Sequence, residues 1–372
     1  MQWRTRIIST LILILSGTGG GPVCSSLAQQ LALVGAQQRF QLVSRSPIVV
    51  HGKLVGDVFD IASHPTQPLF FVVDRQPPGV FVLTANGRFL RSYGRQGEGP
   101  GEFLGPPSVT VWGDTLLVLD PTRNRLEAYR VTTGQLLTLS MLPQSLPGFQ
   151  HWILHSNHLV LYLSGRRHSA LVEVYDFSRR RYTHTLSISK LTPEHDLLLS
   201  YIGSGGLALL GDSLVLATPA DRLTLYFLNL RTGQQGIWLT LQDPDFRIQP
   251  APDLEKLLRQ GRWRAYQKQW VGYLTSNSRT CGLFVLDNGL LAVQLEYGPD
   301  QQSRWLRLIV IDLATRQEID RITLPVTVRQ QYGLMESIFR TAQGPCLYIE
   351  RFLEEQDRWA LWPWCLEPSS SP

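Results

Sequence analysis

The segment GRFLRSYGRQGEGPGEFLGPPSVTVWGDTLLVLDPTRNRLEAY, residues 87–129, shows the pattern on which the whole chain is built. It consists of short apolar runs separated by polar or glycine-rich turns. Runs of this kind predict antiparallel strands. The turn at its start, Ala85-Asn86-Gly87, carries the strongest hairpin signal, because Asn and Gly tolerate the positive φ angles of a type I′ turn. We therefore interpret the segment as the end of one four-stranded unit, a crossover and most of the next unit.

The same unit recurs along the rest of the chain. Five complete four-stranded units are followed by one with three strands, and their first strands begin near residues 58, 109, 152, 207, 282 and 337. A repeat of about 40 to 50 residues with four strands is typical of a β-propeller. The strand expected at Arg39–Val50 has no partner nearby in sequence and can supply the missing edge. The sequence thus predicts an all-β, six-bladed β-propeller of four-stranded antiparallel blades over residues 39–366, closed by this N-terminal strand, with one helical insertion at 242–280 between blades four and five.

Two pieces of the opening segment resemble a known family. GRFLRSYGRQGEGPGEF (87–103) and LLVLDPTRNRLEAY (116–129) resemble the NHL-repeat class of six-bladed propellers, and more closely the exported bacterial six-bladed propeller proteins. The motif is specific in blades one and two and fades in blades three to six. The resemblance implies a propeller scaffold that usually serves binding or interaction. Some members of the class, such as amidating lyases and strictosidine-synthase-like proteins, are enzymes with metal or catalytic residues at the channel, but no matching ligand set occurs here and no catalytic residue is assigned.

Residues 1–28 have the features of a signal peptide. Arg4 and Arg6 form a basic start, residues 7–15 an apolar run, and the small residue Ala28 ends a cleavage site. The apolar run is shorter than the roughly 18 to 20 residues that span a bilayer. We therefore expect an exported protein, periplasmic or extracellular, with no transmembrane span. The alternative is a lipoprotein signal in which Cys24 carries the lipid anchor.

The net charge argues against one class of partner, and the cysteine positions allow one disulfide to be considered. The formal charge of +5 falls to +3 once the two leader arginines are removed, which is too weak and too scattered to favour nucleic acid. Cys346 and Cys365 lie symmetrically about the turn expected at 354–357. A hairpin pairing places them opposite each other, as a cross-strand disulfide or as two reduced, packed cysteines. Cys281 is then expected to be a small buried hydrophobe.

Candidate ligand-binding residues gather on what we call the long-loop face, which carries the loops between blades and those between second and third strands. Loops carry binding residues more often than strands do. Arginines there are suited to an anionic ligand, although ordinary solvated arginines and aspartates that close their own loops are the alternative. The candidates are Arg75, Asp120, Arg123, His168, Asp221 and Arg222, together with Arg262 in the insertion.

Two loops of this face have distinctive composition. Gly94–Gly105 is rich in glycine and could cradle a phosphate, but it lacks the Gly-Lys-Ser/Thr ending of a P-loop. A tight crossover with Phe103 inserted between blades is the simpler interpretation. Pro252–Leu274 combines apolar residues at helical spacing with a basic side. It is expected to form a lid, a partner-binding or membrane-surface helix, or a cap packed on the ring.

No catalytic motif accompanies this architecture. The eight histidines are scattered without metal-ligand spacing, so no cofactor is predicted, and a metal site stays open only as a less favoured alternative. The sequence therefore favours an exported, non-enzymatic binding or scaffold protein that engages a protein, peptide or glycan through its long-loop face. The alternative is a propeller lyase or hydrolase with a polar or metal site at the channel mouth. The oligomeric state stays open.

Overall fold

The computed structural model describes residues 39–50, 58–142, 149–163, 170–188, 205–248, 256, 259–265, 268–269, 277–286, 289–297, 303–324, 328–329, 337–341, 344–353 and 358–369. The chain divides into two units, 1–39 and 40–372, and every described strand belongs to the second. The predicted signal peptide and Cys24 lie outside the described residues.

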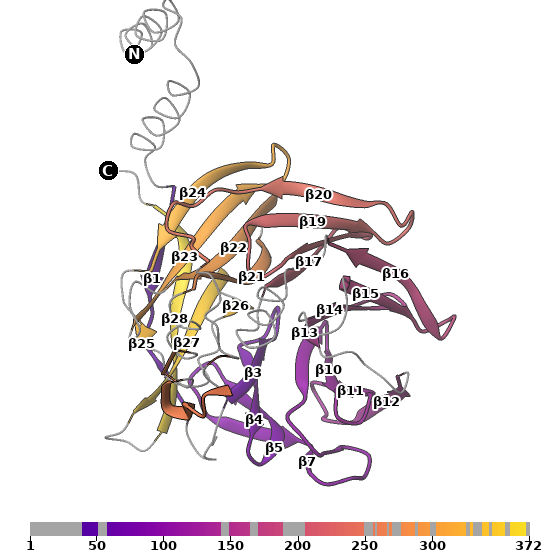
Figure 1. Ribbon diagram of the computed structural model, residues 1–372. Helices are drawn as coiled ribbons and strands as arrows, with labels where there is room; N and C mark the ends of the chain where they lie inside the picture. The colour runs from indigo at the N-terminus through magenta and orange to yellow at the C-terminus, as the bar shows by residue number, and fades with distance from the viewer. Residues whose placement is uncertain are drawn as a thin grey trace, which may run out of the picture. The chain divides into compact units, whose positions relative to one another are not determined.

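Six antiparallel sheets form the second unit (Figure 1). Blade one comprises β3 (Val58–Ser63), β4 (Leu69–Arg75), β5 (Pro78–Thr84) and β6 (Phe89–Tyr93). Blade two comprises β9 (Ser108–Trp112), β10 (Thr115–Asp120), β11 (Arg125–Arg130) and β12 (Leu136–Met141). Blade three comprises β13 (Phe149–His155), β14 (His158–Leu163), β15 (Ala170–Asp176) and β16 (Arg181–Ser187). Blade four comprises β17 (Gly206–Leu210), β18 (Leu214–Thr218), β19 (Thr224–Asn229) and β20 (Gln235–Thr240). Blade five comprises β21 (Arg279–Leu286), β22 (Leu290–Tyr297), β23 (Ser303–Asp312) and β24 (Gln317–Thr323). Blade six comprises β26 (Ser337–Thr341), β27 (Gly344–Leu353) and β28 (Arg358–Pro368).

The first strands of the blades follow one another around a ring. β3 contacts β9, β13 contacts β17, β17 contacts β21, β21 contacts β26, and β26 contacts β3. The remaining step, from β9 to β13, is bridged by a hydrogen bond from Trp152 Nε1 to Ser108 Oγ at 2.9 Å. The predicted arrangement of six four-stranded antiparallel blades is confirmed.

The N-terminal strand belongs to the last blade. β1 (Phe40–Ser44) pairs antiparallel with β28, with Phe40 opposite Pro368 and Ser44 opposite Trp364. β2 (Ile48–Val49) pairs with the same strand further along, and β25 (Val328–Arg329) adds a short pairing to β23. β1 is therefore the outer strand of blade six, so the first and last described strands of the chain lie in one sheet.

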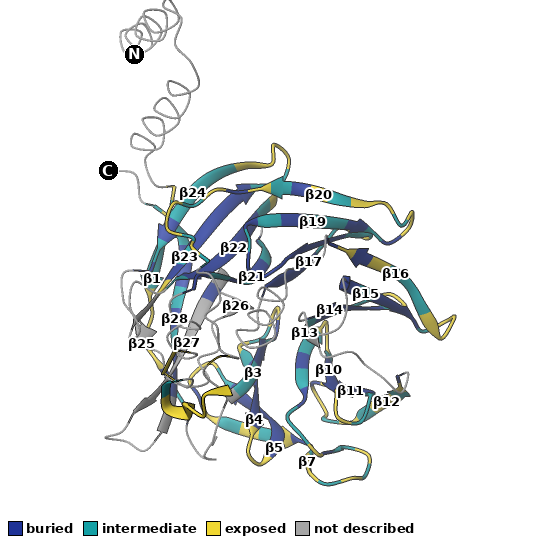
Figure 2. Cartoon of the chain, viewed as in Figure 1, coloured by how far each residue is buried: buried dark blue, intermediate teal, exposed yellow. Residues whose placement is uncertain are grey.

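The apolar core lies between neighbouring blades. In one cluster Val73 and Val80 of blade one pack with Leu116 and Val118 of blade two, and all four side chains are fully buried. Where burial is described, Figure 2 shows that it is greatest along the middle strands of the blades and that exposure concentrates at turns and outer strands. The middle strands are near-continuous apolar runs, such as LFFVV in β4 and LLVL in β10, because both faces of a blade pack against neighbouring blades.

The segment after blade four is described only in fragments. Lys256, Arg259, 263–265 and 268–269 have helical backbone, and the other residues between 249 and 276 that would define a helix lie outside the described part. The helical insertion therefore stays a prediction. Within the described residues, no helix is both long and apolar enough to cross a membrane.

Candidate functional site

The glycine-rich crossover between blades one and two uses its own backbone donors. Two short strands, β7 (Arg95–Gln96) and β8 (Glu102–Phe103), pair in parallel across it. Three glycine N–H groups donate hydrogen bonds of 2.8–3.2 Å to acceptors of the fold. The donors are Gly97, Gly99 and Gly101, and the acceptors are Phe103 O, Glu102 Oε2 and Glu127 Oε1, respectively. Donors that are already engaged do not form a phosphate cradle.

Close packing explains the glycine that opens the crossover. Phe103 is fully buried in the cluster between blades one and two, beside Tyr93 and Tyr129. Gly94 has φ +70°, and a Cβ added there would lie 2.0 Å from the Phe103 ring. Only glycine combines this backbone conformation with so close an approach. The expected tight crossover with Phe103 inserted between blades is confirmed.

Arg125 on β11 binds the crossover through hydrogen bonds to its backbone carbonyls. Its guanidinium donates to the carbonyl oxygens of Gly99 at 3.1 Å and Glu102 at 2.5 Å. Its Nε lies 2.9 Å from Glu127 Oε1, and its side chain is 6 % exposed while that of Glu127 is fully buried. A planar group with five donors suits this combination of two carbonyls and a carboxylate.

Asp120 closes the neighbouring loop in the expected way. Its Oδ1 accepts the N–H groups of Thr122 at 3.0 Å and Arg123 at 3.2 Å, and its Oδ2 lies 3.6 Å from Arg125. Burial raises the pKa of Asp120, and the hydrogen bonds and the two arginines oppose that shift only in part. Arg123 also donates to the carbonyl of Glu98. Both candidates are thus engaged with the fold.

The other candidate residues do not converge on one site. Arg75 lies over the ring of Phe59, 5.1 Å from its centroid. Asp221 pairs with its neighbour Arg222 through two hydrogen bonds of 2.9 and 3.0 Å, and the bond to Asp221 is the main cause that raises the pKa of Arg222. Arg262 is exposed in the insertion. His168 lies outside the described residues.

A chain of three side chains crosses the first strands of blades one, two and three. Trp152 on β13 donates to Ser108 Oγ on β9 at 2.9 Å, and Ser108 donates to Asp60 Oδ2 on β3 at 2.6 Å. The N–H of Val109 donates to the same Asp60 oxygen at 2.9 Å, and that of Ile61 to Oδ1 at 2.8 Å. This axial relay ties three blades together by polar contacts at their inner edges.

Asp60 is the unusual member of the axial relay. It keeps some solvent contact, yet protein atoms surround its carboxyl group. Desolvation raises the pKa of Asp60 to about 6, against the hydrogen bonds from Ser108, Val109 and Ile61 that lower it. The axial relay was not predicted from the sequence. The available signal was one acid within the otherwise apolar first strand VFDIAS, but its partners lie 48 and 92 residues further along the chain, so no local pattern identifies them.

The two ends of the insertion after blade four are hydrogen-bonded to each other, an arrangement that we call its closed base. The N–H of Ser278 donates to the carbonyl of Arg247 at 2.8 Å, and the N–H of Arg247 donates to Ser278 Oγ at 2.9 Å. Just before it, Asp243 receives two hydrogen bonds from Arg307 of blade five, at 2.7 and 2.9 Å, and its side chain is 1 % exposed. Residues 242–247 and 278–280 are therefore part of the ring, and residues 248–277 are the segment between these two points, described only in fragments.

The described part of that segment is cationic and carries an aromatic side chain. Trp263 is 60 % exposed. Arg262 and Arg264 on either side of it are exposed, as is Lys268. Indole and guanidinium groups are over-represented where proteins bind one another, because they combine a large contact area with directed hydrogen bonds.

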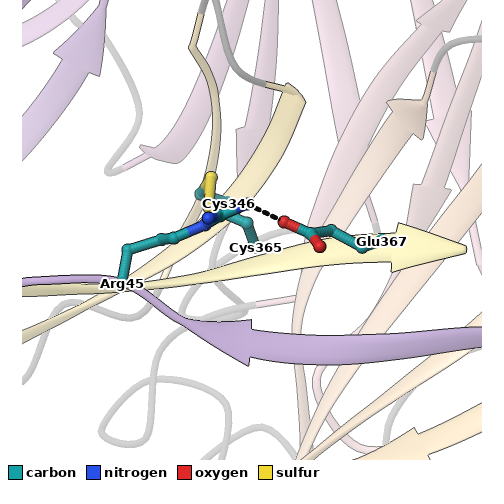
Figure 3. The surroundings of a disulfide bond; sticks show 4 residues. All are labelled: Arg45, Cys346, Cys365 and Glu367. Atoms are coloured by element: carbon teal, nitrogen blue, oxygen red, sulfur yellow. Dashed lines mark hydrogen bonds and ion pairs between the residues drawn. A yellow bond between two sulfur atoms is a disulfide. The ribbon is translucent and has the colours of Figure 1, made fainter. Parts of the chain in front are cut away.

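The two cysteines on β27 and β28 are joined. Cys346 lies directly opposite Cys365 in the strand register, and the two form a disulfide, both nearly fully buried (Figure 3). Figure 3 also shows the ion pair between Arg45 and Glu367 beside it. Cys281 is partly buried, and its sulfur lies 3.6 Å from the carbonyl of Gln294.

No metal centre is assembled within the part of the chain that the structure describes. No group of three or more His, Cys, Asp or Glu side chains there is placed to hold an ion. His151, near the start of the inner strand β13, is densely packed beside Tyr162, and burial lowers its pKa to about 4. It is therefore neutral at physiological pH.

Comparison with known proteins agrees with this geometry. Residues 54–182 match the family model described as a 6-bladed beta-propeller. The chain is a six-bladed β-propeller. No curated protein sequence matches it significantly. A solved structure similar to this propeller is that of a Bacteroides fragilis NCTC 9343 protein thought to be exported, with 15% identity, 89% of this chain and 96% of that chain covered, and a TM-score of 0.57.

Two further solved structures are more distant from this propeller. The RRP9 WD40 repeats share 12% identity over 87% of this chain and 100% of that chain, with a TM-score of 0.48. U3-55K shares 10% identity over 87% of this chain and 83% of that chain, with a TM-score of 0.44. At these identities the likeness concerns the fold alone.

Proposed function

We propose that the propeller is an exported, non-enzymatic binding protein and that segment 248–277 is its contact element for a protein, peptide or glycan with acidic groups. The observation that carries the proposal is that Arg247 and Ser278 pair at the two ends of a segment whose described part exposes Trp263 between two arginines. A rigid scaffold that presents one long loop is a common arrangement for recognition. Export is supported by the composition of residues 1–28.

Because Arg247 and Ser278 hold the two ends of the segment together, the segment between them can be deleted without separating the strands that it joins. Replacing residues 249–276 by Gly-Ser is expected to leave the ring folded, because Asp243, Arg247 and Ser278 keep their contacts. Partner recovery from a periplasmic extract should then fall at least about tenfold, as expected when the main contact residues are removed. The measurement is quantitative mass spectrometry of pull-downs with wild-type and deleted protein, after circular dichroism has shown equal folding.

A charge-reversal variant separates the surface chemistry from the loss of the segment. Arg262→Glu with Arg264→Glu should lower recovery of the same partners, whereas Arg130→Glu on the exposed end of β11 should not. Equal recovery by wild-type and deleted protein would remove the segment from the proposed function.

The alternative of a lyase or hydrolase at the channel has one supporting observation. Asp60 lies on an inner strand, and its pKa of about 6 is suited to a general base. Both of its carboxyl oxygens, however, already accept hydrogen bonds from Ile61, Ser108 and Val109. These three hydrogen bonds occupy most of the acceptor positions of the carboxylate and lower its basicity, so binding is the better-supported function.

A further inference from the structure

A cavity of about 320 Å³ lies between blades one and six, beside the disulfide. Its walls include the turn after β3, the turn after β5 and the two cysteines, so it lies on the side of the ring opposite the long-loop face. Ile48, Leu69 and Phe70 contribute apolar surface to the lining. Its size is at the lower end of small-molecule sites in proteins. A ligand here would be separate from the contact element proposed above, because the lining residues come from 45–85 and 346–365.

The charged side chain of this cavity is Arg45, and the strand register places it. The N–H of Arg45 donates to the carbonyl of Pro363 at 2.8 Å, so Arg45 continues the ladder of β1 with β28. In that ladder Val43 lies directly opposite Cys365. Side chains two residues apart on a strand point to the same face, so Arg45 lies on the face that carries the disulfide. Its guanidinium reaches Glu367, two residues beyond Cys365, and Figure 3 shows the side chain running past the disulfide to this partner.

The guanidinium of Arg45 has donors to spare. Its Nη2 donates to Glu367, and it makes no other hydrogen bond or ion pair with the described residues. A guanidinium carries five N–H donors in a plane, so one carboxylate oxygen leaves most of them unused. The side chains of Arg45 and Glu367 are 50% and 33% exposed, and water weakens an ion pair exposed to this degree. A second carboxylate can therefore share the guanidinium, or replace Glu367 on it, at small cost.

We propose that this cavity binds a small carboxylic acid with a compact apolar body, in its ionised form. The carboxylate contacts the guanidinium of Arg45, because the two planar groups match in a geometry of two parallel hydrogen bonds. The apolar body packs against the wall that Ile48, Leu69 and Phe70 provide. A fully hydrated anion would leave that wall unused, so the lining favours an acid whose hydrocarbon part leaves water on binding.

The test uses two nearly isosteric probes, 4-fluorobenzoate and 4-fluorobenzamide, titrated at pH 7 into the mature protein and followed by ¹⁹F NMR. The benzoate should bind the wild type about five to ten times more tightly than the amide, as expected for a charge-assisted contact at a half-exposed site. Arg45→Met should remove this preference and leave the affinity for the amide unchanged. Arg130→Met, on the exposed end of β11, controls for the loss of one positive charge and should keep the preference.

The present partner of Arg45 gives the sharper test. Glu367→Gln removes the carboxylate that competes for the guanidinium, so it should tighten benzoate binding about threefold and leave the amide unchanged. Arg45→Met and Glu367→Gln thus act in opposite directions on the same probe. If the ion pair served only to hold β1 against β28, the two substitutions would act in the same direction on both probes.

A third variant tests the location. Ala85 lies in the exposed turn at the cavity wall, so Ala85→Trp should block entry and weaken both probes. The proposal is overturned if the benzoate does not bind the wild type at about 5 mM, a concentration at which a ligand of this size binds a matched site. It is equally overturned if Arg45→Met keeps the preference for the benzoate, if Glu367→Gln weakens its binding, or if Ala85→Trp leaves binding unchanged.

Discussion

Replacing Arg125 by methionine is expected to lower the free energy of unfolding by about 3–5 kcal/mol, the usual loss when one partner of a buried ion pair is removed. The substitution leaves the buried carboxylate of Glu127 without its cation and removes the donors to the carbonyls of Gly99 and Glu102. Methionine fills a similar volume, so the loss reports charge and hydrogen bonding more than packing. Urea unfolding followed by fluorescence measures it.

Two variants control this prediction. Arg130→Met on the same strand is exposed and should stay within about 0.5 kcal/mol of the wild type. Adding Glu127→Gln to Arg125→Met should recover at least about 1 kcal/mol, because the buried carboxylate is then neutral. A loss no larger for Arg125→Met than for Arg130→Met would show that the crossover is held by its apolar contacts alone.

The second large effect is a dependence of stability on pH that originates at Asp60. A carboxyl group whose pKa is raised in the folded state stabilises the fold fully below its unfolded pKa, and this contribution is lost as the pH rises through the folded value. The pKa of Asp60 is raised from 3.8 to about 6. At about 1.4 kcal/mol per pKa unit, reduced for the solvent contact that Asp60 keeps, the loss between pH 4 and pH 7 is about 2 kcal/mol.

Comparison with Asp60→Asn isolates this contribution. Other groups act in the opposite direction. Hydrogen bonding by Ser178 lowers the pKa of Asp176, so the contribution of Asp176 to the stability of the fold is lost as the pH falls. These contributions cancel in the difference between wild type and variant. That difference in unfolding free energy should shift by about 2 kcal/mol towards the variant from pH 4 to pH 7. Parallel curves for the two proteins would contradict the prediction, and Asp212→Asn on an exposed turn controls for the loss of one carboxylate.

Much of the fold could be predicted because the information is local. Asn-Gly and Gly-Asp turns, strand length and alternation act over a few residues, and they placed the blades and the crossover. The position of Cys346 opposite Cys365 also follows from counting out from one turn, and the register of β27 and β28 agrees. That these cysteines are joined rather than reduced was left open by the sequence and is given by the structure.

The candidate sites were less predictable for a physical reason. Asp120 and Arg123 were expected on the loop between the second and third strands of blade two, and Asp120 ends β10 while Arg123 lies between β10 and β11. Their contacts with Arg125 and Glu98 depend on how the crossover folds back. Nothing near Arg125 in sequence indicates that its side chain ends under two carbonyls. Arg45 was not singled out at all, because an arginine at the end of an outer strand has no distinctive pattern until the strand register places it beside the disulfide.

The sequence by itself determined the number of blades, their strand order and the crossover between blades one and two. Each of these depends on hydrophobic periodicity and turn chemistry, which are properties of neighbouring residues. Only the tertiary structure decided which side chains meet: Asp60 with Ser108 and Trp152, and Arg45 with Glu367 beside the disulfide. Closing the ring brings these residues together across blades, and the distances that set hydrogen bonds, pKa values and cavities exist only after that closure.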